Sequence, residues 1–267
     1  MSDRVATLLA RLGFAARGLV YLLVGWFALD AAMRGTRPGD NQGAIASLAD
    51  LPFGRVLLII VALGLAGYAV WRLTEAILDP EHRGSDMKGA FERAGYALSG
   101  IVHVALAFYA LRITTRSAAA TGAAPGDAAA RDWLATLLAA PAGAMLVGLV
   151  AIGLLIVAIV QFTKAWKASF AKELGGDTPL PHRVCLIGRI GYAARGVVFL
   201  LSGWFFLRAA TAAEADRAGG MGAALRYLQG QEHGAILLGI VAIGLGLFGI
   251  YSLVESRYRH INVDLPG

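Results

Sequence analysis

The sequence predicts an all-α polytopic membrane protein, with six transmembrane helices arranged as three parallel two-helix repeats in a pseudo-threefold bundle. Three observations lead to this prediction. Of the 267 residues, 57% are hydrophobic and 16% are charged, whereas a soluble domain is about 25% charged. The chain contains several apolar runs of about 20 residues, the length that crosses a bilayer as a helix. One of these runs returns twice further along the chain.

The repeated segment is the first apolar run. It reads RLGFAARGLVYLLVGWFAL at 11–29, RIGYAARGVVFLLSGWFFL at 189–207 and, with less similarity, RAGYALSGIVHVALAFYAL at 93–111. Each copy is followed by a polar loop and a second apolar run, and the second runs align on Gly54, Gly143 and Gly234. The repeating unit is therefore a helical hairpin. We assign a single membrane domain over 1–267, with repeats at 9–79, 91–166 and 187–257.

The expected spans are 12–33, 53–78, 92–114, 134–165, 186–210 and 232–256. Because each unit has two spans, all three units share one orientation, and the repeats are parallel about an axis along the membrane normal. A pseudo-threefold bundle is the natural packing, with a linear array as the alternative. Before each second span we expect a short helix in the outer interface, at 44–51, 132–140 and 223–228.

Lysine and arginine are distributed unevenly between the two ends of the spans. Fifteen of the 24, including all four lysines, lie in the N-terminal part, around 72–93 and 164–195, and at the C-terminus. The positive-inside rule makes this side cytoplasmic, so both termini are expected there. The net charge of +6 then reflects basic cytoplasmic loops rather than binding of nucleic acid.

Ionisable residues inside the predicted spans occupy aligned positions in two of the repeats. The first repeat has Arg17 and Glu75, the third has Arg195 and Glu255, and the second has Ser99 and Lys164 instead. Charges within spans are costly, and an arginine–carboxylate contact can be bidentate. We therefore expect Arg17–Glu75 and Arg195–Glu255 ion pairs that hold each hairpin together. The alternative is an anion or lipid-headgroup site, with a ring of arginines at the cytoplasmic mouth: Arg11, Arg93 and Arg189.

His103 is the one histidine placed well inside a predicted span, where the aligned positions hold Tyr21 and Phe199. A single histidine among aromatic side chains is typical of a packing residue, and haem ligation or a proton relay is the alternative. No cluster of His, Cys, Asp and Glu has the spacing of metal ligands, and Cys185 is the single cysteine. We expect no metal and no cofactor, with His103 as the candidate ligand if a cofactor is bound.

The pattern G-[FY]-A-x-R-G-x-[VY]-[YF], with a tryptophan near the end of the span, resembles the bacterial membrane family called domain of unknown function 1206. The resemblance covers about 9–256. The first and third units match through Gly13, Arg17, Gly18 and Gly191, Arg195, Gly196, and the second departs from the pattern. The resemblance implies an inner-membrane location and three tandem two-span repeats. The family has no assigned activity, so it implies no catalytic residue.

Motifs of catalysis are missing from the sequence. There is no nucleophile–base motif, P-loop or dinucleotide fingerprint, so we expect no enzymatic activity. The favoured function is a structural or interaction protein, an accessory subunit. The alternatives are a channel or transporter for a small ion or solute along the pseudo-threefold axis, and a binder of lipid or a lipophilic cofactor. The expected partners are the bilayer and other membrane proteins or a second copy. A specialised site is expected where the symmetry is broken, at Ser99, His103 and Lys164.

Overall fold

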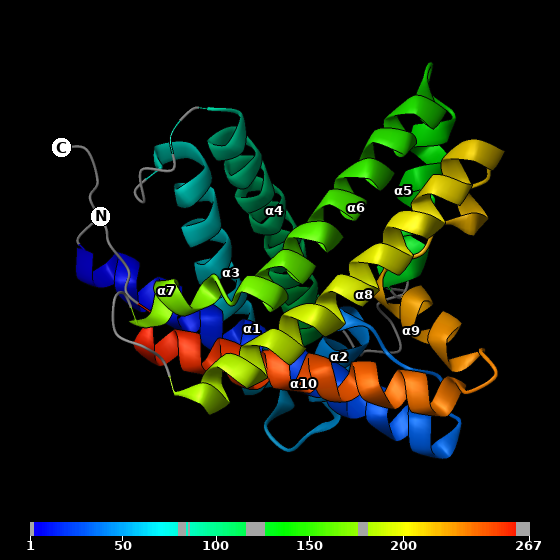
Figure 1. The fold of residues 1–267 in the computed structure, drawn as a ribbon. Helices are drawn as coiled ribbons and strands as arrows, with labels where there is room; N and C mark the ends of the chain where they lie inside the picture. The colour runs from blue at the N-terminus through cyan, green and yellow to red at the C-terminus, as the bar shows by residue number, and fades with distance from the viewer. Residues whose placement is uncertain (1–2, 80–83, 85, 116–125, 176–180, 260–267) are drawn as a thin grey trace.

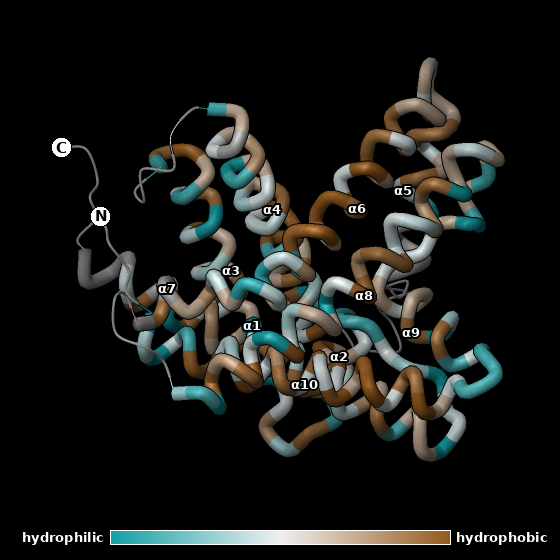
Figure 2. Tube along the Cα trace, in the orientation of Figure 1, coloured by the Kyte–Doolittle hydropathy of each residue, from teal (hydrophilic) through white to brown (hydrophobic). Residues whose placement is uncertain are grey.

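The computed structural model describes residues 3–79, 84, 86–115, 126–175 and 181–259. This part of the chain is helical, without strands, and its six long helices correspond to the six predicted spans (Figure 1). They are α1 (Asp3–Arg34), α3 (Gly54–Leu78), α4 (Met87–Thr115), α6 (Gly143–Lys167), α8 (His182–Ala212) and α10 (Gly234–Tyr258). Each is long and apolar enough to cross a membrane. Figure 2 shows hydrophobic residues along these helices and hydrophilic ones gathered near their ends. The prediction of six membrane helices is confirmed.

Short helices precede each returning span, as the sequence predicts. They are α2 (Asn41–Ser47) with the 3₁₀ turn η1 (Leu48–Asp50), α5 (Gly126–Leu138), and α9 (Met221–Gln229), which follows the 3₁₀ turn η3 (Ala215–Arg217). A further short helix, α7 (Phe170–Gly175), follows α6.

The predicted fourth span, 134–165, is wrong at its start, because α5 and α6 are separate helices. The backbone at Ala142 is left-handed, with φ of 59°, and Pro141 cannot donate a backbone hydrogen bond to continue a helix. Gly143 begins α6 because a side chain at this position would collide with the carbonyl oxygen of Leu137. The aligned Gly54 meets the same obstacle at Leu48.

The long helices pack as three pairs, α1 with α10, α3 with α4, and α6 with α8. Each pair joins the returning helix of one repeat to the first helix of the next, and α10 completes the series by packing on α1. Figure 1 shows the pairs as an open horseshoe, with α1 and α10 side by side along its base. The same aligned contact occurs in all three pairs: Gly18 with Leu253, Gly100 with Leu73, and Gly196 with Phe162.

Contacts inside a repeat are extensive in the first and third repeats, where α1 packs on α3 and α8 packs on α10. Glycines allow the close approach: Gly13 lies against Tyr68, Gly64 against Ala16, Gly191 against Phe248, and Gly244 against Ala194. In the second repeat α4 and α6 share no comparable contact. The aligned glycines, Gly95 and Gly153, have no described atom close to where a side chain would begin. The closed pseudo-threefold bundle therefore stays a prediction.

The sequence of the second repeat explains why α4 and α6 stay apart. Leu98 occupies the position that Ala16 and Ala194 hold in the other repeats. These alanines are each 7% exposed, whereas Leu98 is 52% exposed. A branched side chain in this row prevents the close approach of backbones that small residues permit.

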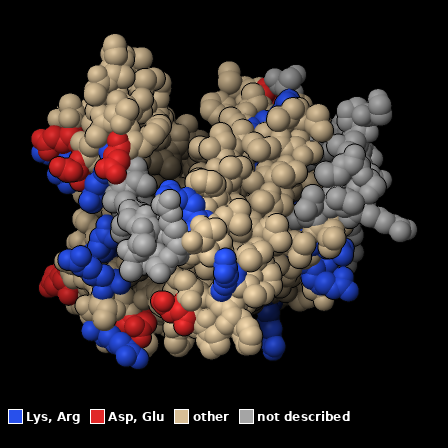
Figure 3. All heavy atoms as spheres, turned by 180° about the vertical axis from the view of Figure 1, so that it is seen from behind, with Lys and Arg blue, Asp and Glu red and all other residues tan. Residues whose placement is uncertain are grey.

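The two unpacked faces border an apolar groove, which we call the open groove. It is lined by Gly95, Leu98 and Val102 of α4 and by Gly153, Val157 and Val160 of α6, all of them partly or fully exposed. Figure 3 shows a notch between the lobe of α3 and α4 and the lobe of α6 and α8. The groove is therefore open to the surroundings of the protein, which for these spans is the hydrocarbon of a membrane.

Candidate functional site

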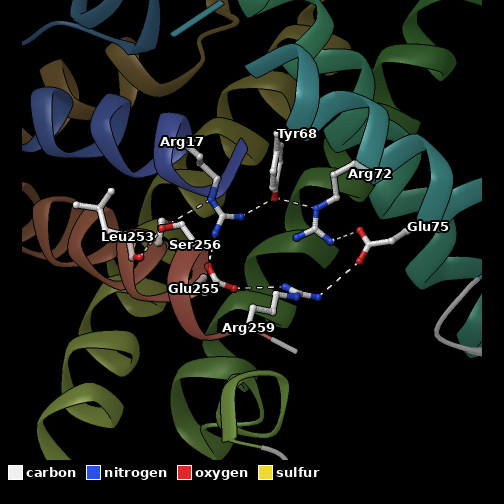
Figure 4. Close-up of polar contacts among 9 residues, drawn as sticks. Arg17, Tyr68, Arg72, Glu75, Leu253, Glu255, Ser256 and Arg259 are labelled. Carbon is white, nitrogen blue, oxygen red and sulfur yellow. Dashed lines mark hydrogen bonds and ion pairs between the residues drawn. The ribbon is translucent and has the colours of Figure 1, made fainter. Parts of the chain in front are cut away.

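A cluster of polar side chains from α1, α3 and α10 is buried at the end of the bundle where α3 and α10 finish (Figure 4). We call this cluster the ion network. Its members, each at most 8% exposed, are Arg17, Tyr68, Arg72, Glu75, Ser252, Glu255 and Arg259. Buried charges must be paired and hydrogen-bonded to be tolerated, so the contacts among these groups decide what the cluster can do.

The contacts of the ion network close into a ring. Arg17 pairs with Glu255 and donates hydrogen bonds to the hydroxyl of Tyr68, at 2.5 Å, and to that of Ser252, at 3.2 Å. Arg72 donates to Tyr68 at 2.8 Å and to Glu75 at 2.6 Å. Arg259 completes the ring, with its guanidinium nitrogens 3.3 Å from Glu255 and 3.6 Å from Glu75.

The phenyl ring of Phe14 lies beside all three guanidinium groups of the network. Its centroid is 4.9 Å from Cζ of Arg17, 5.0 Å from that of Arg259 and 5.9 Å from that of Arg72. The face of an aromatic ring attracts cations, which partly compensates the excess of three arginines over two glutamates. Repulsion among the arginines is thus reduced by two carboxylates and by aromatic rings, of which Phe14 is shared by all three arginines.

Local geometry brings these residues together at one level. Glu75 and Glu255 each lie three residues before the end of their helix, and Arg72 lies one turn before Glu75 on the same face. The chain leaves α10 in an extended conformation at Arg259, with φ of −62° and ψ of 129°. At the end of α3 the aligned residue, Asp79, is left-handed instead. The extended conformation at Arg259 is found together with a side chain that lies between the two carboxylates.

The predicted pairing within each hairpin is wrong. Arg17 pairs with Glu255 of the third repeat, and Glu75 pairs with Arg72 and Arg259. The reason is that α1 packs more extensively on α10 than on α3, so that the carboxylate presented to Arg17 comes from α10. Arg195 forms no ion pair with Glu255; among the described residues its recorded neighbours are aromatic rings.

Four members of the ion network are not predicted from the sequence: Tyr68, Arg72, Ser252 and Arg259. Arg259 lies beyond the predicted end of the last span, and the charge distribution places Arg72 among the basic residues of the cytoplasmic side. One signal was available, because Arg72 and Glu75 are three residues apart and opposite charges at this spacing interact on a helix. Tyr68 and Ser252 carry no comparable signal.

The symmetry-breaking residues lie at the two other helix pairs. His103 is half-buried on α4, with its ring 4.5 Å from that of Tyr68. Its Nδ1 lies 2.7 Å from the carbonyl oxygen of Ser99, and because a carbonyl only accepts, Nδ1 donates. Lys164 lies on α6, with its ammonium 5.6 Å from the ring centre of Tyr192.

A metal site is not formed by the described residues, since no group of three or more of their His, Cys, Asp and Glu side chains could hold an ion. His103 is the nearest approach to a cofactor ligand. Its Nε2 is the nitrogen left for a ligand. The other described histidines lie at helix ends, with His182 the first residue of α8 and His233 directly before α10. Haem ligation at His103 therefore stays an untested alternative.

Comparison with known proteins identifies the repeat unit. The model of the family described as Domain of Unknown Function (DUF1206) matches residues 12–79, 94–168 and 190–259. The chain is 35% identical to an uncharacterized protein, YxxB, of Bacillus subtilis (strain 168) over 254 residues, which are 94% of this chain and 90% of that protein. No solved structure matches the chain. With all three repeats matched, the chain belongs to the family described as Domain of Unknown Function (DUF1206).

Proposed function

We propose that this protein is a non-enzymatic integral membrane protein with an interaction role. As an accessory subunit, it receives a transmembrane helix of a partner protein in the open groove between α4 and α6. The observation that carries the proposal is the exposure of two helix faces whose counterparts are buried against each other in the other repeats.

Residues at aligned positions show how much more exposed these helix faces are in the second repeat than in the other two. Val102 of α4 is 45% exposed, whereas Val20 and Val198 at the same position are 2% and 4% exposed. On α6, Val160 is 46% exposed, whereas the aligned Trp71 is 2% exposed. The second repeat thus has the helix faces that pack together in the other two repeats, but in the second repeat these faces do not touch each other.

A helix is the occupant that these faces fit. In the first and third repeats the corresponding faces bind a helix, with Gly13 and Gly191 at the points of closest approach. Gly95 and Gly153 provide the same small residues in the open groove, and small residues are the usual contact points between helices in membranes. Because Leu98 keeps α4 away from α6, these surfaces stay available to another chain.

The ion network supports a scaffold rather than a channel or an acid–base enzyme. Each of its two carboxylates contacts arginines, and each of its arginines contacts a carboxylate. The arginines also lie beside the ring of Phe14. Groups that are paired in this way connect α1, α3 and α10 firmly. The protein then presents α4 and α6 from a rigid base.

The proposed location is the bacterial inner membrane, with both termini in the cytoplasm. Lysine and arginine are more frequent at the end of the spans that carries the ion network, and basic residues favour the cytoplasmic side. The ion network then lies toward the cytoplasmic leaflet.

Site-specific photo-crosslinking tests the proposal. A photoreactive amino acid at Val102, inside the open groove, is compared with the same probe at Ile60, which is 58% exposed on α3 outside the groove. We expect Val102, in membranes of the native host, to form an adduct with one membrane protein, which Ile60 does not form. A Gly95→Leu, Gly153→Leu variant fills the groove and should lose the adduct. Adducts with lipid alone, or with a second copy alone, would contradict the proposal.

A further inference from the structure

A charged side chain of α8, Arg195, faces the inside of the horseshoe. Its Cζ lies 4.3 Å from the ring centre of Phe248 on α10 and 5.4 Å from that of Tyr21 on α1. These two helices form the base of the horseshoe (Figure 1). His103 of α4 is close enough for its imidazole to interact with the charge of Arg195. Arg195 therefore lies on the inner side of the bundle, among helices from all three repeats.

The polar contacts of Arg195 differ from those of the aligned Arg17. Arg17 pairs with Glu255, and its Nε donates a hydrogen bond to Ser252. Within the described part of the chain, Arg195 forms no hydrogen bond or ion pair, and its Nε is buried without an acceptor. Aromatic rings attract a guanidinium but do not neutralise it, and a charge within a membrane span is costly without a partner. Arg195 thus lacks the carboxylate that Arg17 has.

The side of Arg195 that remains exposed faces α6 and the open groove. The α6–α8 and α10–α1 interfaces have the same register, as the glycine contacts of α8 and α1 show. At α10–α1, the ring of Phe248 lies 5.1 Å from Cζ of Arg17. The aligned residue of α6 is Val157, which lines the open groove. A valine covers less of a guanidinium than a phenyl ring does. Accordingly, Arg195 is half-buried, whereas Arg17 is 6% exposed.

We propose that the partner helix in the open groove carries an aspartate or glutamate that pairs with Arg195. This inference rests on the proposed function and gives the partner a chemical property. The two carboxylates buried in the described spans, Glu75 and Glu255, already belong to the ion network, so the carboxylate comes from another chain. It has the role toward Arg195 that Glu255, on a neighbouring helix, has toward Arg17. A guanidinium binds a carboxylate through two parallel hydrogen bonds.

The alignment also predicts the depth of the partner's acidic residue. Because Arg195 occupies the position of Arg17, the carboxylate lies at the level of the ion network, toward the end of the bundle where α3 and α10 finish. Complementary charge at one level determines the register in which two helices associate and excludes partners without it. The open groove is therefore selective for a helix with an acidic residue in that half of the membrane.

The test uses the photoreactive probe at Val102 in membranes of the native host. Arg195→Gln should lower the yield of the partner adduct at least about tenfold, as expected for a lost charge-assisted contact. Arg195→Lys keeps the charge and should keep most of the adduct. Arg208→Gln, on the same helix but exposed beside Trp204, should leave the yield unchanged. The melting temperature of purified Arg195→Gln should not fall below that of the native chain, since the variant removes a charge without a partner.

An exchange of charges then tests the contact itself. Mass spectrometry of the adduct identifies the partner helix, and its aspartate or glutamate is replaced by arginine. This change should abolish the adduct with the native chain and restore it with Arg195→Glu. An adduct that forms equally in Arg195→Gln, or a partner helix without an acidic residue at the predicted level, overturns this inference and leaves the proposed function intact. Absence of any protein adduct in the native chain overturns both.

Discussion

The second repeat differs from the first and third in how its two helices are held. The apolar stretches of α4 and α6 are each 22% buried, compared with 56% for α1 and α3, 50% for α10 and 33% for α8. Yet α4 and α6 each pack extensively on one helix of a neighbouring repeat. The contact between repeats occurs three times and the contact within a repeat twice. The structural unit of this protein is therefore the pair formed between repeats, rather than the hairpin that the sequence suggests.

The charged residues separate the second repeat from the other two in the same way as the helix packing does. The ion network joins the first and third repeats through Arg17, Glu75 and Glu255. The second repeat meets it through aromatic rings, with Tyr96 4.9 Å from Cζ of Arg72 and His103 4.5 Å from the ring of Tyr68. The second repeat instead contributes Lys164 to the α6–α8 interface, where Lys164 occupies the position that Glu75 and Glu255 hold in the other repeats. Packing and charge together divide the molecule into a closed part and an open part, and four experiments test that division.

The largest effect is expected from Glu255→Gln. This change leaves Arg17 and Arg259 buried without their shared carboxylate, and breaking a buried pair costs about 3–5 kcal/mol. The aligned change in the second repeat, Lys164→Gln, involves a half-buried group and should cost under about 1 kcal/mol. Melting temperatures in one detergent compare the two variants. Equal losses would show that the closed part is not held by the ion network.

The next effect concerns the glycines of the hairpins. Gly13→Leu and Gly191→Leu place a side chain against the backbone of the facing helix, and overpacking of this kind costs about 1–3 kcal/mol. Gly95→Leu meets open space and should change stability by no more than about 0.5 kcal/mol. The measurement is again thermal melting. A Gly95→Leu variant as unstable as Gly13→Leu would mean that α4 and α6 are packed together in the membrane.

A double-mutant cycle distinguishes pairing between repeats from pairing within a hairpin. Arg17→Ala and Glu255→Ala should couple by about 1–3 kcal/mol, as residues in direct contact do. The coupling of Arg17→Ala with Glu75→Ala should be smaller, because these residues interact only through Tyr68 and the other arginines. Coupling energies come from the stabilities of the single and double variants. A stronger coupling to Glu75 would restore the pairing first predicted from the sequence.

The smallest effect on stability is expected from Leu98→Ala, within about 0.5 kcal/mol, because Leu98 is exposed. The change gives α4 the alanine of the other repeats, so α4 and α6 should approach each other. Spin labels at Ile101 and Ile159, both exposed, report this distance in a Cys185→Ser background. A shift to shorter distances is expected for Leu98→Ala and not for Leu111→Ala, on the outer half of α4. Identical distance distributions in all variants would refute the role of Leu98.

Composition and periodicity were sufficient to predict the six helices and the three repeats, because an apolar run of bilayer length has few alternatives to a helix. The partners of the charged residues could not be predicted in the same way. Alignment of the repeats showed that Arg17 and Glu75 vary together, but it could not show which helix lies beside α1. That choice depends on packing around the whole bundle. Arg259 was missed for a related reason, since its contacts depend on how the chain turns after α10.

The distance along the chain between Arg17 and Glu255, 238 residues, has a consequence for synthesis. Arg17 is made and inserted with the first helix, long before the last helix leaves the ribosome. Until α10 arrives, Arg17 has neither Glu255 nor Ser252 and must rely on Tyr68, headgroups or water. The joining of the last helix to the first is thus the step that removes an exposed charge from an unfinished protein. A chain that stops before α10 would keep that charge, which distinguishes unfinished copies from complete ones.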